Sequence, residues 1–141
     1  MWRSDAPASR FDLAVSETPI EGGGKDLLVS VSLTGDAAND VRRLLSEDPR
    51  FRLWVDVKPA AGASSTSVNS ASEATAIAVQ VKELMRQLRI RSGAERIGLI
   101  LYSPASVALF VGQRLNALGE VIAYERRIAG GYQEAVIIQT G

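Results

Sequence analysis

The segment Gly98–Asn116 reads GLILYSPASVALFVGQRLN. It opens with an apolar run, breaks at Ser103-Pro104-Ala105-Ser106 and then resumes with helical spacing of its apolar residues. This pattern predicts a strand that ends at a turn of small residues and passes directly into a helix. Because the free N–H groups at a helix N-terminus attract anions, the turn is a candidate binding site. Alternatively, Ser103 only caps the helix and the turn binds nothing.

The flanking sequence predicts further strands around this one. DLLVSVSLT (26–34) and FRLWVDVKP (51–59) alternate between two faces, and the partly polar second face of 51–59 places that strand near a sheet edge. ERIGLILYS (95–103) is apolar on both faces, as expected for a central strand. EVIAYERR (120–127) and YQEAVIIQ (132–139) complete the set. A weaker alternation in RFDLAVSETPI (10–20) indicates a possible short edge strand.

Three helices are predicted between these strands. They run from about Ala37 to Ser46, from a capping box at Ser70 and Glu73 to Ser92-Gly93, and from about Pro104 to Leu118. Asp36 is a plausible N-cap for the first helix. The second is the clearest, since its apolar residues recur every three or four positions without a gap.

The order of these elements predicts an α/β fold. Three strand–helix units are followed by two strands joined by RIAGG (127–131), which is too short for a parallel crossover. We therefore expect a mainly parallel sheet of about five strands with an antiparallel C-terminal hairpin at one edge. Residues 1–9 are interpreted as a tail or linker and residues 10–141 as a single domain.

Composition excludes several function classes. The chain of 141 residues contains no Cys and no His, so thiolate or imidazole zinc sites and Cys-His or Ser-His-Asp nucleophilic sites are impossible. With a formal net charge of zero, it lacks the basic excess of a duplex nucleic-acid binder. No apolar run is long enough to span a membrane. We expect a cytoplasmic protein with no metal, no cofactor and no membrane partner.

A polar ligand site is predicted where the parallel strands end, because the carboxyl ends of such strands share one edge of the sheet. The residues expected there are Ser32, Thr34, Gly35, Lys58, Pro59, Ser103, Pro104, Ala105 and Ser106. Lys58 is the only cation among them, and the small, polar loop 60–72 leaves from the same edge. A solvated lysine at a strand end is the alternative interpretation of Lys58.

Other charged residues have simpler explanations. The helix dipole accounts for Asp36 and Asp40 at the start of the first helix, and a surface ion pair with Lys58 accounts for Asp56. No pair of carboxylates resembles an acid/base pair, so no catalytic residue is predicted. The arginines near the end of the second helix indicate a solvated surface or a contact between protomers; they are Arg86, Arg89, Arg91 and Arg96.

Four segments together resemble the C-terminal part of SAVED domains, the sensor modules of bacterial anti-phage effectors. They are DLLVSVSLTGDAANDVRRLL, KPAAGASSTSVNSASEATAIAVQVKELMRQL, IGLILYSPASVALFVGQRLN, and VIAYE with GYQEAVII. Within them, Ser103-Pro104 leading to Gly112-Gln113-Arg114, and Tyr124-Glu125 near the end, match the family pattern. The likeness covers residues 10–140.

This resemblance implies a Rossmann-like, CARF-like three-layer domain that binds a cyclic di-, tri- or tetranucleotide as a second messenger. In such proteins, binding drives oligomerisation and activates a fused or associated effector, in CBASS or CRISPR defence. A full SAVED domain is longer and contains a second, upstream CARF-like half. We therefore expect that this chain holds one half and works with the other half, an effector and further copies of itself.

Two other functions remain open at this stage. A ring nuclease would cleave the cyclic oligonucleotide, with Lys58 and hydroxyl groups positioning the 2′-hydroxyl of the ligand itself. A purely structural interaction module would leave the polar edge empty and use Trp54 and the arginines as a contact between protomers. Ring size, bases and linkage of the ligand are not encoded in any motif of the sequence.

Overall fold

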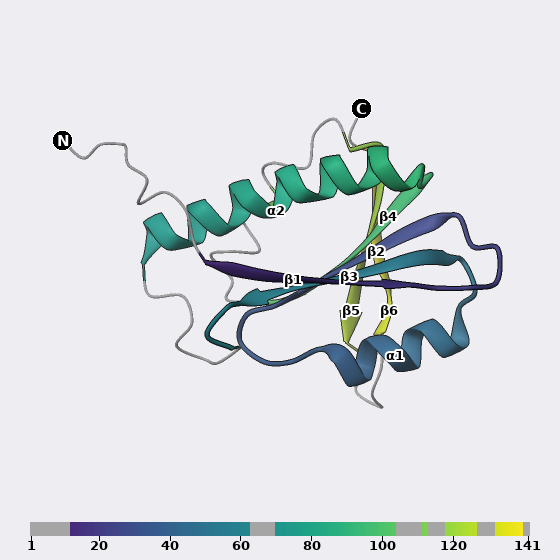
Figure 1. Cartoon of the computed structure of the whole chain (residues 1–141), viewed down its shortest axis with the longest axis horizontal. Coiled ribbons are helices and arrows are strands. Elements are labelled where there is room, and N and C mark those ends of the chain that lie inside the picture. Colours follow the sequence, from purple (N-terminus) through teal and green to yellow (C-terminus); the bar gives the residue numbers. More distant parts are fainter. Residues whose placement is uncertain (1–11, 63–69, 104–110, 113–117, 127–131, 140–141) are drawn as a thin grey trace.

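The computed structural model describes residues 12–62, 70–103, 111–112, 118–126 and 132–139. These residues form one sheet with helices on both of its faces (Figure 1). The elements are β1 (Leu13–Pro19), β2 (Asp26–Ser32), α1 (Ala38–Glu47), β3 (Phe51–Pro59), α2 (Ala71–Ser92), β4 (Arg96–Tyr102), β5 (Glu120–Arg126) and β6 (Tyr132–Gln139). The prediction of an α/β fold is confirmed.

The sheet has six strands in the order β1-β3-β2-β4-β5-β6. The pairs β3–β2, β2–β4 and β4–β5 are parallel, whereas β1–β3 and β5–β6 are antiparallel. The C-terminal hairpin is confirmed as one edge. The expectation of about five strands with one antiparallel edge is corrected, because the weakly alternating segment near the N-terminus pairs with β3 and makes the other edge antiparallel too.

Among the labelled helices, α2 packs against one face of the sheet and α1 against the other (Figure 1). On one face, alternate residues of the central strands meet the apolar stripe of α2, including Ile77, Val81 and Met85. On the other face, Leu28, Phe51 and their neighbours meet α1. Because β2 lies at the centre and is covered on both sides, all seven of its residues are buried.

Local capping fixes where α2 begins and ends. The Ser70 hydroxyl accepts a hydrogen bond from the Glu73 N–H at 3.1 Å, and Gly93 takes a left-handed conformation with φ of 70°. Both ends of this helix agree with the sequence prediction. For α1, Ala37 rather than Asp36 occupies the N-cap position, although the Asp36 carboxylate accepts the Ala38 N–H at 2.9 Å.

Some predicted features lie outside the described residues. These are the tail at 1–9, residues 63–69 of the long loop, and most of the predicted helix at 104–118. Within that helix, Val111 and Gly112 are described and helical, and Val111 is fully buried.

Candidate functional site

The carboxyl ends of β3, β2 and β4 lie side by side, because these three strands are parallel neighbours. The backbone N–H groups of Leu33 and Thr34 donate to the Tyr102 carbonyl oxygen, at 2.9 and 3.1 Å, and so join the ends of β2 and β4. We call residues 32–36, 56–59 and 102–103 the carboxyl-end rim. The predicted convergence of three strand ends is therefore present.

The predicted site residues differ in how they lie at this rim. Thr34, Gly35, Lys58 and Ser103 are half-buried and line its surface. Ser32 and Pro59 are buried. Residues Pro104, Ala105 and Ser106 lie outside the described part of the chain.

A buried carboxylate organises the rim from below. Asp56, which is only 5% exposed, accepts hydrogen bonds at Oδ1 from the hydroxyls of Ser30 at 2.6 Å and Ser32 at 2.9 Å. Ser32 Oγ accepts the Ala37 N–H at 3.2 Å, and Ser30 Oγ accepts from Trp54 Nε1 at 2.9 Å. The network thus ties β2 and β3 to the start of α1.

The interpretation of Asp56 as half of a surface ion pair is wrong with respect to its burial. In the alternation of β3, Asp56 falls on the same face as Trp54 and Lys58, and α1 covers that face. The sequence signal that would have revealed it is the pair Ser30 and Ser32, two hydroxyls on the matching face of the neighbouring strand.

Lys58 lies between two carboxylates of different exposure. Its Nζ is 3.7 Å from Asp56 Oδ2 and 4.0 Å from Asp36 Oδ2. The Asp56 side chain is 7% exposed, whereas the Asp36 side chain is 61% exposed. The ammonium therefore stands at the boundary between the buried network and the solvent, where it can reach an anion on the surface.

Tyr102 packs against Gly35 at the same rim. A Cβ added to Gly35 would lie 3.1 Å from Tyr102 Cε2, which is closer than an ordinary contact. The absent side chain therefore lets the ring approach the turn after β2 closely.

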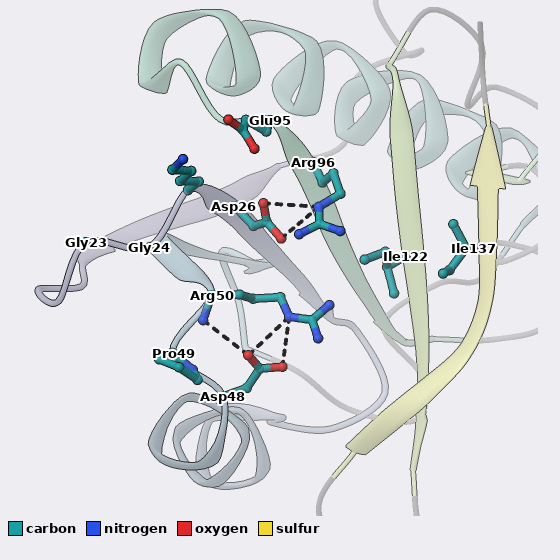
Figure 2. Close-up of a pocket in the computed structure, with 11 residues that line it drawn as sticks. Gly23, Gly24, Asp26, Asp48, Pro49, Arg50, Glu95, Arg96, Ile122 and Ile137 are labelled. Carbon is teal, nitrogen blue, oxygen red and sulfur yellow. Dashed lines mark hydrogen bonds and ion pairs between the residues drawn. The ribbon is translucent and has the colours of Figure 1, made fainter.

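A second hollow, of about 550 Å³, lies at the opposite, amino-terminal ends of the strands (Figure 2). We call it the amino-end hollow; the residues that line it include Gly24, Asp26, Asp48, Arg50, Arg96, Ile122 and Ile137. Two ion pairs line it: Arg96 Nε lies 3.3 Å from Asp26 Oδ2, and Arg50 Nε lies 3.0 Å from Asp48 Oδ2. Lys25 and Glu95 also line the hollow.

Asp26 differs from Asp56 in how its charge is compensated. It is buried, and its Oδ2 atom has an ion-pair neighbour in Arg96 but no hydrogen bond of good geometry. Burial raises the pKa of the Asp26 carboxyl, and the Arg96 guanidinium offsets only part of this effect. The sequence prediction did not include this site.

A structural interaction module would need Trp54 and the arginines near the end of α2 on the surface, and only some of these residues are exposed. Trp54 is 6% exposed, and the Arg42 guanidinium lies 5.7 Å from the centre of its ring, so Trp54 is part of the core and not of a protomer contact. Arg91 forms an ion pair with Glu17 of β1 at 2.7 Å. Among the described helices, none is long and apolar enough to cross a membrane.

Comparison with known proteins identifies the family. The chain matches, over residues 1–138, the family model of the SMODS-associated and fused to various effectors sensor domain, abbreviated SAVED. The chain therefore belongs to the SAVED domain family, and the resemblance seen in the sequence is confirmed.

A curated relative and several solved structures support this assignment. CD-NTase-associated protein 4 of Enterobacter hormaechei subsp. hoffmannii (strain UCI 50) is 32% identical over 126 residues, which are 89% of this chain and 25% of the relative. The chain thus spans about a quarter of the curated relative that it matches.

The solved structures are of the Acinetobacter baumannii Cap4 SAVED/CARF-domain containing receptor. The structure with the cyclic trinucleotide 2′3′3′-cAAA has a TM-score of 0.75 at 14% identity and covers 93% of this chain and 29% of the receptor. The structure with 3′3′3′-cAAA has a TM-score of 0.76 at 12% identity and covers 94% and 30%. At these identities the likeness establishes the shared fold.

Proposed function

We propose that this chain is a ligand-binding sensor module that recognises a cyclic oligonucleotide at the carboxyl-end rim. The observation that carries the proposal is the convergence of three strand ends, two of which are joined through the Tyr102 carbonyl oxygen, around the half-exposed ammonium of Lys58. Membership of a sensor-domain family and the likeness to a receptor solved with cyclic trinucleotides support it.

The proposed contacts follow from the chemistry of a phosphodiester ring. Lys58 supplies positive charge to a phosphate, and the hydroxyls of Thr34, Ser103 and Ser106 donate hydrogen bonds to its oxygens, as do backbone N–H groups after Ser103. The remaining predicted residues, Ser32, Gly35, Pro59, Pro104 and Ala105, shape the site. The loop 60–72 covers a base.

The wider function that we propose rests on the family resemblance. The chain forms one Rossmann-like half of a sensor within residues 10–141, and it completes its pocket with a second CARF-like half. Ligand binding then promotes association of copies and activates a fused or associated anti-phage effector in the cytoplasm. In this proposal catalysis resides in the effector and not in the sensor.

The test is a calorimetric titration of the chain with 3′3′3′-cAAA and 2′3′3′-cAAA. The double variant Lys58→Ala/Ser106→Ala should bind at least tenfold more weakly, which corresponds to about 1.4 kcal/mol. Lys25→Ala removes the same charge at the other end of β2 and should leave affinity unchanged. Equal affinities of the wild type and the double variant would reject the site, and linear products recovered after the titration would reject the non-catalytic role.

A further inference from the structure

We infer that Asp56 is a positioning residue for the proposed phosphate site, and that Asp36, on the other side of the same lysine, opposes binding. This inference rests on the proposed function, because it concerns the regulation of the same site. Both carboxylates lie near the Lys58 ammonium at similar distances, 3.7 and 4.0 Å. Their different surroundings give them opposite effects on an incoming anion.

The Asp56 carboxylate is fixed before any ligand arrives. Its Oδ1 accepts the Ser30 and Ser32 hydroxyls, so its orientation is set from within the sheet and Oδ2 is left facing Lys58. A lysine side chain loses conformational entropy when it is ordered. By holding the ammonium at the rim, Asp56 meets part of this cost before the ligand binds.

The Asp36 carboxylate has the opposite character. Its side chain is largely exposed, and it caps the start of α1 through Oδ1, which accepts the Ala38 N–H. A phosphate that approaches Lys58 from solvent meets the negative charge of Asp36 and must replace it as the partner of the ammonium. Asp36 therefore keeps the unliganded site closed to weak anions.

Asparagine substitutions separate these roles with minimal structural change. Asp36→Asn retains an oxygen for the Ala38 N–H and removes only the competing charge. Asp56→Asn retains an oxygen for Ser30 and Ser32 but turns the amide NH₂ toward the Lys58 ammonium. Two donors then face each other, so Lys58 leaves its position at the rim.

The predicted changes in affinity therefore have opposite signs. Asp36→Asn should tighten binding of 3′3′3′-cAAA about threefold, and Asp56→Asn should weaken it about threefold. General electrostatics alone predicts that both substitutions tighten binding, since each removes a negative charge near an anion. The sign for Asp56→Asn thus distinguishes a positioning residue from a nearby charge.

The experiment is a double-mutant cycle with Lys58→Met, measured by calorimetry on the full chain with 3′3′3′-cAAA. If Asp56 acts through Lys58, Asp56→Asn should have no further effect in the Lys58→Met background. A loss of affinity caused by damage to the fold would instead persist there. Thermal unfolding of each variant in the same buffer identifies any such damage.

The failures of the two proposals are distinguishable. If the wild type does not bind, or if Lys58→Met binds as tightly as the wild type, the proposed site is wrong and this inference falls with it. If Lys58→Met weakens binding but Asp56→Asn tightens it, or weakens it equally in both backgrounds, only the positioning role of Asp56 is overturned.

Discussion

The carboxyl-end rim and the amino-end hollow lie at opposite ends of the same strands, and each contains a buried aspartate. Asp56 at the rim accepts two hydroxyl hydrogen bonds and faces Lys58. Asp26 at the hollow has Arg96 beside it, and one of its oxygens has no hydrogen bond. The hydrogen-bonding capacity of the buried carboxylate is therefore met more fully at the rim than at the hollow.

This difference distinguishes a site in which a fixed carboxylate orients a cation before a ligand binds from a site in which ion pairs offset the charge of the carboxylates. At the rim, the hydrogen bonds fix a carboxylate whose second oxygen orients a half-exposed cation toward the surface. At the hollow, Arg50 and Arg96 each pair with a carboxylate of the chain, and Asp26 keeps one oxygen without a hydrogen bond (Figure 2). Volume alone would favour the hollow, whereas the convergence of three parallel strand ends around a lysine held by a fixed carboxylate favours the rim as the proposed ligand site.

The largest effect is expected when the rim network is removed. Asp56→Ala takes away the common acceptor of the buried Ser30 and Ser32 hydroxyls and should lower the free energy of unfolding by about 3 kcal/mol. Denaturant titration measures this loss. An unchanged midpoint would mean that the two hydroxyls find other partners and that the rim is not held by Asp56.

A smaller effect is expected from methyl groups added at the two ends. A Cβ on Gly24, beside the hollow, would overlap the carbonyl oxygen of Phe51, which is backbone in β3 and cannot move aside. Gly24→Ala should therefore destabilise the chain by about 2 kcal/mol.

Gly35→Ala is the matched variant at the rim. There the obstacle is the Tyr102 side chain, which can shift by a few tenths of an ångström, so the cost should be less than about 1 kcal/mol. Thermal unfolding compares the two variants. Equal losses of stability would contradict the interpretation that the added methyl group meets rigid backbone at Gly24 and a movable side chain at Gly35.

The smallest effect concerns the charge of Asp26. Since burial raises its pKa in the folded state, the folded chain binds more protons than the unfolded chain in the acid range above the ordinary aspartate pKa of about 3.9. The contribution of the protonated Asp26 carboxyl to the free energy of unfolding is fully present below that range, and it is lost as pH rises through the folded-state pKa. At neutral pH the ionised carboxylate is therefore unfavourable.

Asp26→Asn, which mimics the protonated form, should slightly raise the melting temperature at pH 7. Its advantage over the wild type should shrink as the pH is lowered toward 4. A variant that is less stable than the wild type at pH 7 would show that the ion pair with Arg96 outweighs the cost of burial.

Much of the fold follows from local sequence patterns. The capping box at Ser70, the glycine at 93 and the short joint of the C-terminal hairpin each act through neighbouring residues, so they can be read without the tertiary structure. The alternation in β2 likewise identifies the residues that meet α2. The strand ends of the rim followed from the parallel topology that these patterns predict.

The features that escaped prediction depend on distant contacts. Asp56 looks like a surface residue until α1 covers its face. The edge strand expected within residues 10–20 is present as β1, but its antiparallel pairing with β3 was not predicted. Gly112 lies within the predicted helix, and a Cβ added there would have no described atom within 4 Å, so no close contact with the described residues accounts for this glycine.

The antiparallel directions of β1 and β6 determine where the chain enters and leaves the sheet. Leu13 pairs with Pro59, so β1 begins beside the rim, whereas Gln139 pairs with Glu120, so β6 finishes at the far end of the strands. The five intervals between the six strands also separate these points by about 24 Å across the sheet. A reporter group attached at the start of β1 would therefore lie near the turns of the carboxyl-end rim, whereas one attached at the end of β6 would lie diagonally across the sheet from them.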